Sequence, residues 1–247
     1  MQTVLITGCS SGFGLDAARY FLDKGWNVVA TMRTPRADLF PVSDRLRVLA
    51  LDVTDAASIR AAIEAAGPVD VLVNNAGIGM LAALEGTPMD TVRDIFEANT
   101  LGTIAMTQAV LPQFRERKAG VVINVTSSVT YRSLPLLSVY TASKAAVNAF
   151  TESLALELAP FDIRVRLVLP GRAPDTRFGE NAMTRMQAGA PGAYADFTQN
   201  AFANLRADGP VTTAQDVSEA IWYAATDAAS PMRIPAGADA VEWSREG

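Results

Sequence analysis

Residues 4–14 read VLITGCSSGFG, and this stretch decides the fold. Its apolar half runs into three glycines spaced Gly8-x3-Gly12-x-Gly14, and a segment of helix length follows. Glycines let the backbone turn tightly and approach a pyrophosphate, which the N–H groups at the start of the helix then face. An ordinary strand-to-helix turn is the alternative. The place of the glycines between the first strand and the first helix favours a dinucleotide-binding loop.

Similar apolar runs recur along the chain and are the expected strands, at residues 3–7, 27–31, 48–51, 69–73, 121–125 and 163–169. Segments of helix length lie between them, at residues 13–24, 55–66, 88–118 (a pair of helices) and 138–159. Continuous β-branched runs are typical of parallel strands that are buried on both faces. The alternation predicts an α/β protein with a Rossmann fold, in which a doubly wound parallel sheet has helices on both faces.

The domain organisation follows from length and composition. A chain of 247 residues suits one large α/β domain, and no repeat or linker divides it. We therefore expect a single NAD(P)-binding domain over residues 1–247. The stretch 171–212 is rich in Ala, Gly and Pro and carries scattered aromatic residues and methionines. A long excursion in a compact fold is usually a binding loop, so we expect a substrate lid there. A disordered surface insertion is the alternative.

Composition excludes several classes of function. The chain has no histidine and a single cysteine, Cys9, which excludes His-based catalytic triads, thiolate zinc sites and internal disulfides. We expect no metal site. The net charge of −5 makes nucleic acid and anionic membranes poor partners. Neither a signal peptide nor an apolar run long enough to span a membrane is evident, so we expect a soluble cytoplasmic protein.

The expected second strand ends in a stretch that selects the adenosine ribose. An acid there binds a free 2′-hydroxyl, whereas an arginine accommodates a 2′-phosphate. Here Arg33 occupies the stretch and the first acid is Asp38. We therefore expect NADP(H) to be preferred, with NAD(H) as the alternative. A solvated surface arginine is the other interpretation of Arg33. Asp52 ends the third strand where an adenine ring would lie, or it caps the following helix near Asp55.

Tyr140 and Lys144 open the longest helix. Their spacing of four places both side chains on one helix face. An ammonium group ~5 Å from the phenol at an effective dielectric of ~20 lowers its pKa by roughly 2 units, into a range useful for acid–base work. Ser127 follows the preceding strand and can hydrogen-bond a carbonyl oxygen, unless it is a helix cap and Ser128 takes that role. Asn99 either holds a water molecule or interrupts a helix.

Together these residues resemble the short-chain dehydrogenase/reductase family over essentially the whole chain. The ordered set is far more specific than any one motif, and it consists of Thr7-Gly8-x3-Gly12-x-Gly14, Asp52, Asn74-Asn75-Ala76-Gly77, Asn99, Ser127, Tyr140-x3-Lys144 and Pro170-Gly171. One departure is a threonine that comes one residue late after the proline, at Thr176.

The resemblance implies a nicotinamide-dependent enzyme that interconverts a carbonyl and an alcohol on a small molecule. It implies a catalytic set in which Ser127 and Tyr140 bind the carbonyl oxygen, Tyr140 transfers the proton, Lys144 bonds the nicotinamide ribose, and Asn99 holds a relay water. The expected cofactor-binding residues are Gly8, Ser10, Ser11, Gly12, Phe13, Gly14, Arg33, Asp52, Val53, Asn75, Ala76, Gly77, Tyr140, Lys144, Pro170 and Gly171.

Two other functions stay open. The first is a Rossmann protein that senses NADP(H) without turnover, and the second is a nucleotide-sugar epimerase or dehydratase. The latter relatives are typically longer and carry a Gly-x2-Gly-x2-Gly loop, which this chain lacks. The apolar residues of the expected lid indicate a hydrophobic substrate. Family members commonly pair two long helices, here 99–118 and 138–159, so we expect a homodimer or homotetramer.

Overall fold

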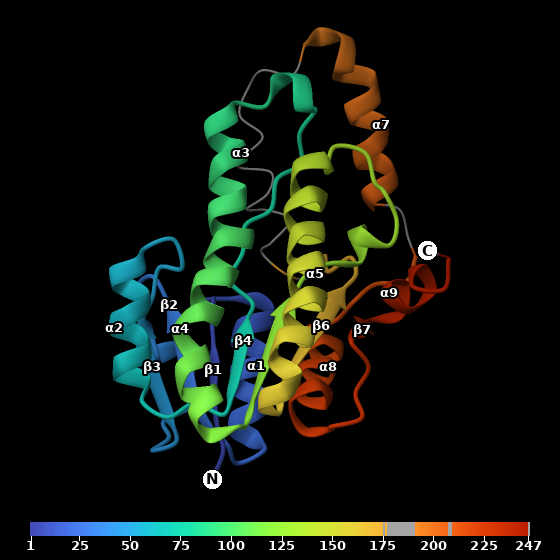
Figure 1. Cartoon of the computed structure of the whole chain (residues 1–247). Coiled ribbons are helices and arrows are strands. Elements are labelled where there is room, and N and C mark those ends of the chain that lie inside the picture. Colours follow the sequence, from blue (N-terminus) through green and yellow to red (C-terminus); the bar gives the residue numbers. More distant parts are fainter. Residues whose placement is uncertain (175, 177–190, 207–208, 247) are drawn as a thin grey trace.

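The structure, a computed structural model, describes residues 1–174, 176, 191–206 and 209–246. Its centre is a seven-stranded sheet in the order β3-β2-β1-β4-β5-β6-β7, with every neighbouring pair parallel (Figure 1). The strands are β1 (Thr3–Ile6), β2 (Asn27–Met32), β3 (Leu46–Ala50), β4 (Val71–Asn74), β5 (Gly120–Val125), β6 (Ile163–Pro170) and β7 (Arg233–Ala236). The described helices are α1 (Gly12–Asp23), α2 (Ala56–Ala66), α3 (Met89–Phe96), α4 (Gly102–Arg117), α5 (Ser138–Leu158), α7 (Ala195–Arg206), α8 (Ala214–Thr226) and α9 (Ala238–Trp243).

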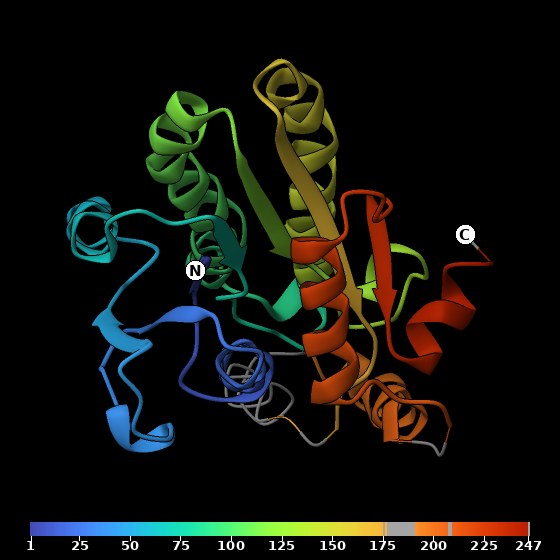
Figure 2. The same ribbon diagram turned by 90° about the horizontal axis from the view of Figure 1, so that it is seen from below.

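Both faces of the sheet are buried, which explains why the strands are continuous apolar runs. Val4 and Ile6 of β1 pack in a core cluster with α1 and α8, while Leu5 between them packs in a second cluster with α2, α4 and α5. Figure 2 shows these helices in two layers on opposite sides of the sheet. The predicted α/β Rossmann fold is confirmed.

The C-terminal part of the sheet was not predicted. β7 has only four residues, includes Pro235, and lies at the edge beside β6. A short strand interrupted by proline is typical of a sheet edge and carries little periodicity. The preceding helix α8 has a readable start, because Thr213 and Asp216 form a capping box. β3 begins at Leu46, two residues before the expected position 48.

The expected pair of helices within 88–118 is nearly continuous. A π-helical turn, Glu97–Leu101, joins α3 to α4 and carries Asn99. A π-turn places one extra residue in the helix and often marks a functional site. Asn99 therefore lies where the α-helix is interrupted by a π-turn, as one interpretation of the sequence expected.

No helix in the described part of the chain is long and apolar enough to cross a membrane. Within the same part, no group of three or more cysteine or acidic side chains lies close enough together to hold a metal ion.

Candidate active site

A cavity of about 1270 Å³ opens at the carboxyl ends of the strands. Its volume exceeds the roughly 300–1,000 Å³ of typical small-ligand clefts and suits a dinucleotide with a substrate. The predicted site residues that line this cavity are Gly8, Ser10, Ser11, Gly12, Phe13, Arg33, Asp52, Val53, Asn75, Ala76, Gly77, Ser127, Tyr140, Lys144, Pro170 and Gly171. Gly14 and Asn99 were predicted too, but they do not line it.

The glycine loop forms one end of the cavity. Gly8 has φ +75°, and a Cβ atom there would lie 2.8 Å from Ala76 Cα, so only glycine fits. Gly14 is buried behind the loop, where a Cβ atom would overlap the Gly8 carbonyl oxygen. Gly14 therefore allows the close packing of the glycine loop, and its predicted part in cofactor binding stays a prediction. Ser11 precedes α1, but its side chain makes no capping hydrogen bond. The first backbone N–H groups of α1 are therefore not covered by the Ser11 hydroxyl.

The rim of the cavity beyond β2 carries one arginine. Arg33 is exposed and lines the cavity. Asp38, the first acid after it, pairs with Arg36 at 2.5 Å, and neither of these two residues lines the cavity. The Asp38 carboxylate is therefore paired with Arg36, away from the position where a ribose hydroxyl would be bound.

Asp52 faces Arg33 across this part of the cavity. Hydrogen bonds from the Thr54 backbone N–H (2.9 Å) and hydroxyl (2.7 Å) hold the pKa of Asp52 below its usual value, and the charge of Arg33 adds to this. Asp52 does not cap α2, because Asp55 does so by accepting the Ala57 N–H at 2.8 Å.

Ser127 and Tyr140 meet where β5 ends and α5 begins. Their hydroxyl groups are hydrogen-bonded to each other, and both side chains are buried. Burial raises the pKa of Tyr140 well above its usual value, and the Ser127 hydrogen bond offsets only part of this increase. The phenol is therefore protonated at neutral pH.

Lys144 lies one helical turn after Tyr140. Its Nζ donates to the Val125 carbonyl at 3.0 Å and lies 6.0 Å from the centre of the Tyr140 ring. Burial lowers the pKa of Lys144 to about 8. The predicted fall in the pKa of Tyr140 is wrong for this structure, because the cost of burying a phenolate dominates and the Ser127 hydrogen bond opposes only part of it.

Asn99 is 1% exposed and is fully engaged behind the cavity. Its Oδ1 accepts the Ile78 N–H at 2.8 Å, while its Nδ2 donates to the Ile78 carbonyl at 2.9 Å and to the Ser143 hydroxyl at 3.0 Å. A Cβ atom on Gly77 would lie 3.0 Å from Asn99 Oδ1 and 3.4 Å from Lys144 Nζ. Asn99 thus fixes the chain after β4 and lies beside Lys144, with Gly77 between them.

The loop after β6 closes over the glycine loop. Thr176 Cβ lies 3.7 Å from the position that a Cβ on Gly12 would occupy. Pro170, Gly171 and Thr176 all line the cavity, so the late threonine still reaches it.

Sequence reasoning missed most of the apolar half of the cavity. Its walls come from four separate segments and comprise Leu81, Val129, Leu134, Leu137, Phe202 and Trp243, of which only Phe202 belongs to the expected lid. Trp243 ends α9, which reaches the site through a buried carboxylate. Asp239 accepts from the Thr212 hydroxyl at 2.8 Å and from the Arg172 backbone N–H at 2.5 Å. Trp243 gave no signal in the sequence, because only tertiary contacts bring α9 to the cavity.

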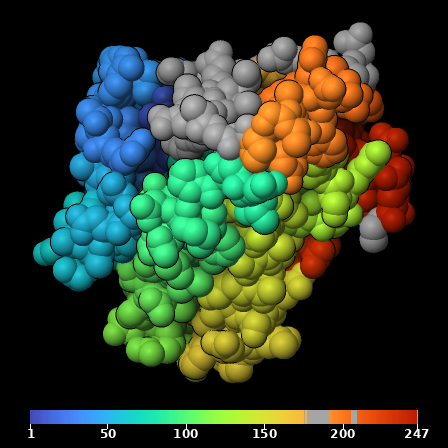
Figure 3. Space-filling model, turned by 90° about the horizontal axis from the view of Figure 1, so that it is seen from above, coloured from blue at the N-terminus to red at the C-terminus, as the bar shows by residue number. Residues whose placement is uncertain are grey.

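The expected lid is described only in part. α7 packs through Ala201 against Ala83 and Leu136, and the space-filling view shows α7 (orange) against the segment that follows β4 (Figure 3). Phe202 lines the cavity. Met183, Met186 and two glycines of the expected lid lie outside the described residues.

Comparison with known proteins gives the family. The model of the family described as "short chain dehydrogenase" matches residues 2–186. The chain is 39% identical over 199 residues to 3-ketodihydrosphingosine reductase of Bacteroides thetaiotaomicron. The aligned region covers 79% of this chain and 72% of that protein. It superposes on a short-chain dehydrogenase from Streptomyces avermitilis with a TM-score of 0.83 and 32% identity, covering 99% and 91% of the two chains.

Solved relatives differ in the nicotinamide cofactor that they hold. A serine dehydrogenase in complex with NADP+ matches with a TM-score of 0.79 and 26% identity, covering 96% of this chain and 95% of that one. A 3-ketoacyl-(acyl-carrier-protein) reductase from Brucella melitensis in complex with NADH matches with a TM-score of 0.77 and 29% identity, covering 95% and 96%. By the family model, the relative and the fold, the chain belongs to the short-chain dehydrogenase/reductase family of oxidoreductases.

Proposed function

We propose that the chain is an NADP(H)-dependent oxidoreductase that interconverts a carbonyl group and a secondary alcohol on an apolar small molecule. The observation that carries this proposal is the buried, hydrogen-bonded pair of hydroxyls from Ser127 and Tyr140. The pair lies in a cavity whose one end is a glycine loop and whose other end is apolar.

The residues present fit a nicotinamide dinucleotide. Gly8 leaves a cradle that any side chain would fill, and the start of α1 can face a pyrophosphate. Arg33 on the rim would hold a 2′-phosphate, and Asp38, the first acid after it, is paired with Arg36 and does not line the cavity. These features support NADP(H) over NAD(H).

The chemistry assigns a separate task to each polar side chain. A bound nicotinamide cofactor supplies or accepts a hydride. Ser127 and Tyr140 hold the carbonyl oxygen with their hydroxyls, and Tyr140, protonated at neutral pH, gives its proton to that oxygen. Lys144 would hold the nicotinamide ribose, while Asn99 keeps Ile78 and the neighbouring Gly77 in place. Because its pKa is raised, Tyr140 holds the proton that reduction of a carbonyl requires.

The apolar half of the cavity supports a hydrophobic substrate. Leu81, Leu134 and Leu137 pack around Tyr140 in one cluster, and Phe202 and Trp243 add aromatic surface. Burying a ring or an alkyl chain against these walls contributes about 25 cal/mol per Å² of apolar area removed from water. The ketone in the name of the Bacteroides relative agrees with this class of substrate.

We also propose that two copies associate through α4 and α5. The inner side of α5 packs on the sheet, whereas its outer side exposes small and apolar residues. Leu156 of α5 is 79% exposed, and Leu101 just before α4 is 48% exposed. A flat face of this kind is suited to helix packing between identical copies.

NADPH oxidation with a panel of cyclohexanone, acetophenone and 2-decanone tests the proposed function. The wild type should reduce at least one ketone, and Tyr140→Phe should lower kcat by about 10²–10⁴-fold while NADPH still binds. Wild-type NADPH binding without turnover of any ketone or matching alcohol would instead favour the non-catalytic NADP(H) sensor.

A further inference from the structure

Helix α5 carries four polar side chains at a constant spacing of four residues: Tyr140, Lys144, Asn148 and Glu152. This spacing places them along one helix face. The first two belong to the site described above. Asn148 is buried at 4% exposure and does not line the cavity, so neither solvent nor substrate accounts for this polar residue.

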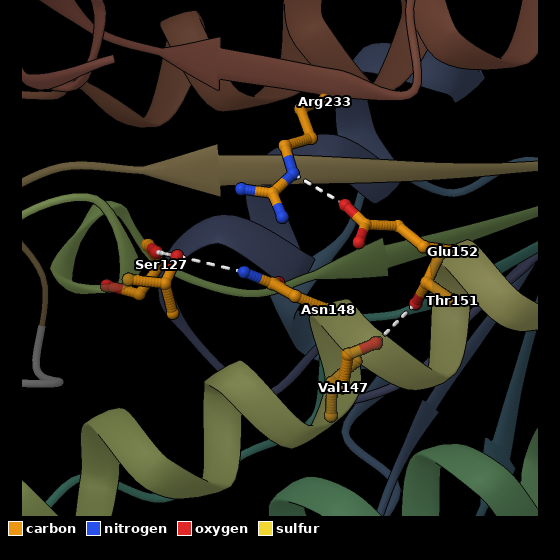
Figure 4. A network of polar contacts seen from close by, with 7 residues as sticks. Ser127, Val147, Asn148, Thr151, Glu152 and Arg233 are labelled. Carbon is orange, nitrogen blue, oxygen red and sulfur yellow. Dashed lines mark hydrogen bonds and ion pairs between the residues drawn. The ribbon is translucent and has the colours of Figure 1, made fainter. Parts of the chain in front are cut away.

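Asn148 connects α5 to the backbone of Ser127 through one hydroxyl group. Its Nδ2 donates to Thr130 Oγ1 at 2.9 Å, and Thr130 Oγ1 donates to the Ser127 carbonyl at 2.8 Å. A hydroxyl has one proton to give. Because the Thr130 hydroxyl uses its proton in the hydrogen bond to the Ser127 carbonyl, its oxygen must accept from the Asn148 amide. The two hydrogen bonds therefore run in one direction, from Asn148 through Thr130 to Ser127. Figure 4 shows Asn148 pointing from α5 toward Ser127.

An ion pair lies beside the same segment. Arg233 at the start of β7 pairs with Glu152 at 2.6 Å, as Figure 4 also shows. Tyr131, next to Thr130, lies near both charges: burial has the largest effect on its pKa, Arg233 lowers it and Glu152 raises it. The residues after Ser127 thus lie against a fixed polar edge of α5.

Ser127 needs such support because, apart from its hydrogen bond to Tyr140, its side chain makes only a weak contact with the backbone. It lies at the end of β5, and its Oγ accepts the Val129 N–H at a long 3.4 Å. Its carbonyl is held by the Thr130 hydroxyl at 2.8 Å and by the Thr130 backbone N–H at 3.2 Å. The shorter of these bonds is the one that depends on Asn148.

We propose that Thr130 and Asn148 are positioning residues, which fix Ser127 so that its hydroxyl and that of Tyr140 converge on one carbonyl oxygen. This inference rests on the proposed function, since it assigns a purpose to the placement of Ser127. We call the two residues the Thr130–Asn148 brace. The brace contacts neither substrate nor cofactor, because neither residue lines the cavity.

The first test compares Thr130→Val with Thr130→Ser in ketone reduction. Valine keeps the shape and removes the hydroxyl, and serine restores it. Thr130→Val should lower kcat/KM for the ketone about 10-fold, less than the 10²–10³-fold typical of removing one oxyanion donor outright. It should leave the Kd for NADPH unchanged. Thr130→Ser should stay within about 2-fold of the wild type.

A primary isotope effect with 4-deuterated NADPH separates positioning from loss of folded protein. Misplaced Ser127 slows hydride transfer itself, so the isotope effect on kcat should rise in Thr130→Val, whereas partial unfolding would not change it. Thr141→Val is the matched control. Its buried hydroxyl has no hydrogen-bond partner among the described residues, and it neighbours Tyr140 in the chain. This control should keep wild-type kinetics.

Asn148→Leu and the double variant test whether the two residues act together. The double variant should lose no more activity than the worse single variant, because both break the same chain. If the fold-losses of activity in the two single variants multiply in the double variant, the brace would be overturned. A Thr130→Val variant that keeps the wild-type kcat/KM and isotope effect would overturn it too.

Hydrogen exchange tests the inference apart from the proposed function. Amides of residues 128–131 should exchange about 10-fold faster in Thr130→Val than in the wild type or Thr141→Val. Unchanged exchange would overturn the brace whatever the activity. If exchange is faster in Thr130→Val but the wild type turns over no ketone, the proposed function alone would be overturned.

Discussion

Lys144→Met should remove the pH dependence of stability that a buried lysine imposes. Burial lowers the pKa of Lys144 from 10.5 to about 8. Below about pH 8 the folded protein must keep a charged ammonium group in a buried position, which costs stability. As the pH rises from there toward 10.5, the folded state loses this proton before the unfolded state does, and the cost disappears.

The linkage relation sets the size of the effect. With pKa values of 10.5 and about 8, the wild type should gain about 2 kcal/mol of unfolding free energy relative to Lys144→Met between about pH 7 and pH 9.5. At pH 7 the penalty itself is about 3 kcal/mol. The variant also loses the Nζ hydrogen bond to Val125, worth about 1 kcal/mol, so it should be more stable by about 2 kcal/mol there.

Urea unfolding at the two pH values measures this difference directly. Comparing Lys144→Met with the wild type cancels the contributions of other titrating groups to the unfolding free energy. One such group is the buried Cys9, whose pKa is raised to about 12. Lys24→Met, at an exposed lysine, serves as the control and should follow the wild type. If wild type and Lys144→Met change in parallel between the two pH values, Lys144 is not desolvated and the argument fails.

Three further changes have expected outcomes. Arg33→Asp should raise the Kd for NADPH about 10- to 100-fold, the range for one charge-assisted phosphate contact. The Kd for NADH should change little, and Arg36→Ala, at an arginine outside the cavity, should alter neither constant. Equal loss of both cofactors would contradict the arginine assignment. Gly171→Ala should cost about 1–3 kcal/mol, because its methyl group would overlap the Asp239 carboxylate, whereas Gly192→Ala meets no atom within 4 Å and should be neutral. Light scattering at micromolar concentration should give at least a dimer, and a clean monomer would refute pairing through α4 and α5.

The sequence predicted those parts of the site that depend on local spacing. Gly8 and Gly12 follow a strand directly, and Tyr140 and Lys144 lie one helical turn apart, so short-range geometry sufficed. The sign of the pKa shift at Tyr140 was missed because spacing gives the distance to a charge but not the extent of burial. Burial depends on β5 and on the leucines packed around the ring, which are tertiary facts.

Other residues were missed because their role depends on distant partners. Asn148 looks like an ordinary polar residue of a helix until Thr130 is placed opposite it. Trp243 reaches the cavity only through the contacts of Asp239 with Thr212 and Arg172, which no local pattern encodes.

The way in which α9 reaches the cavity also fixes the order in which the site can be built during synthesis. The glycine loop at Gly8 leaves the ribosome early, and the first strands can pair as they emerge. Trp243 and the carboxylate of Asp239 emerge only after β6 and α8. A nascent chain can therefore form the glycine loop well before Trp243 is present to complete the apolar half of the cavity.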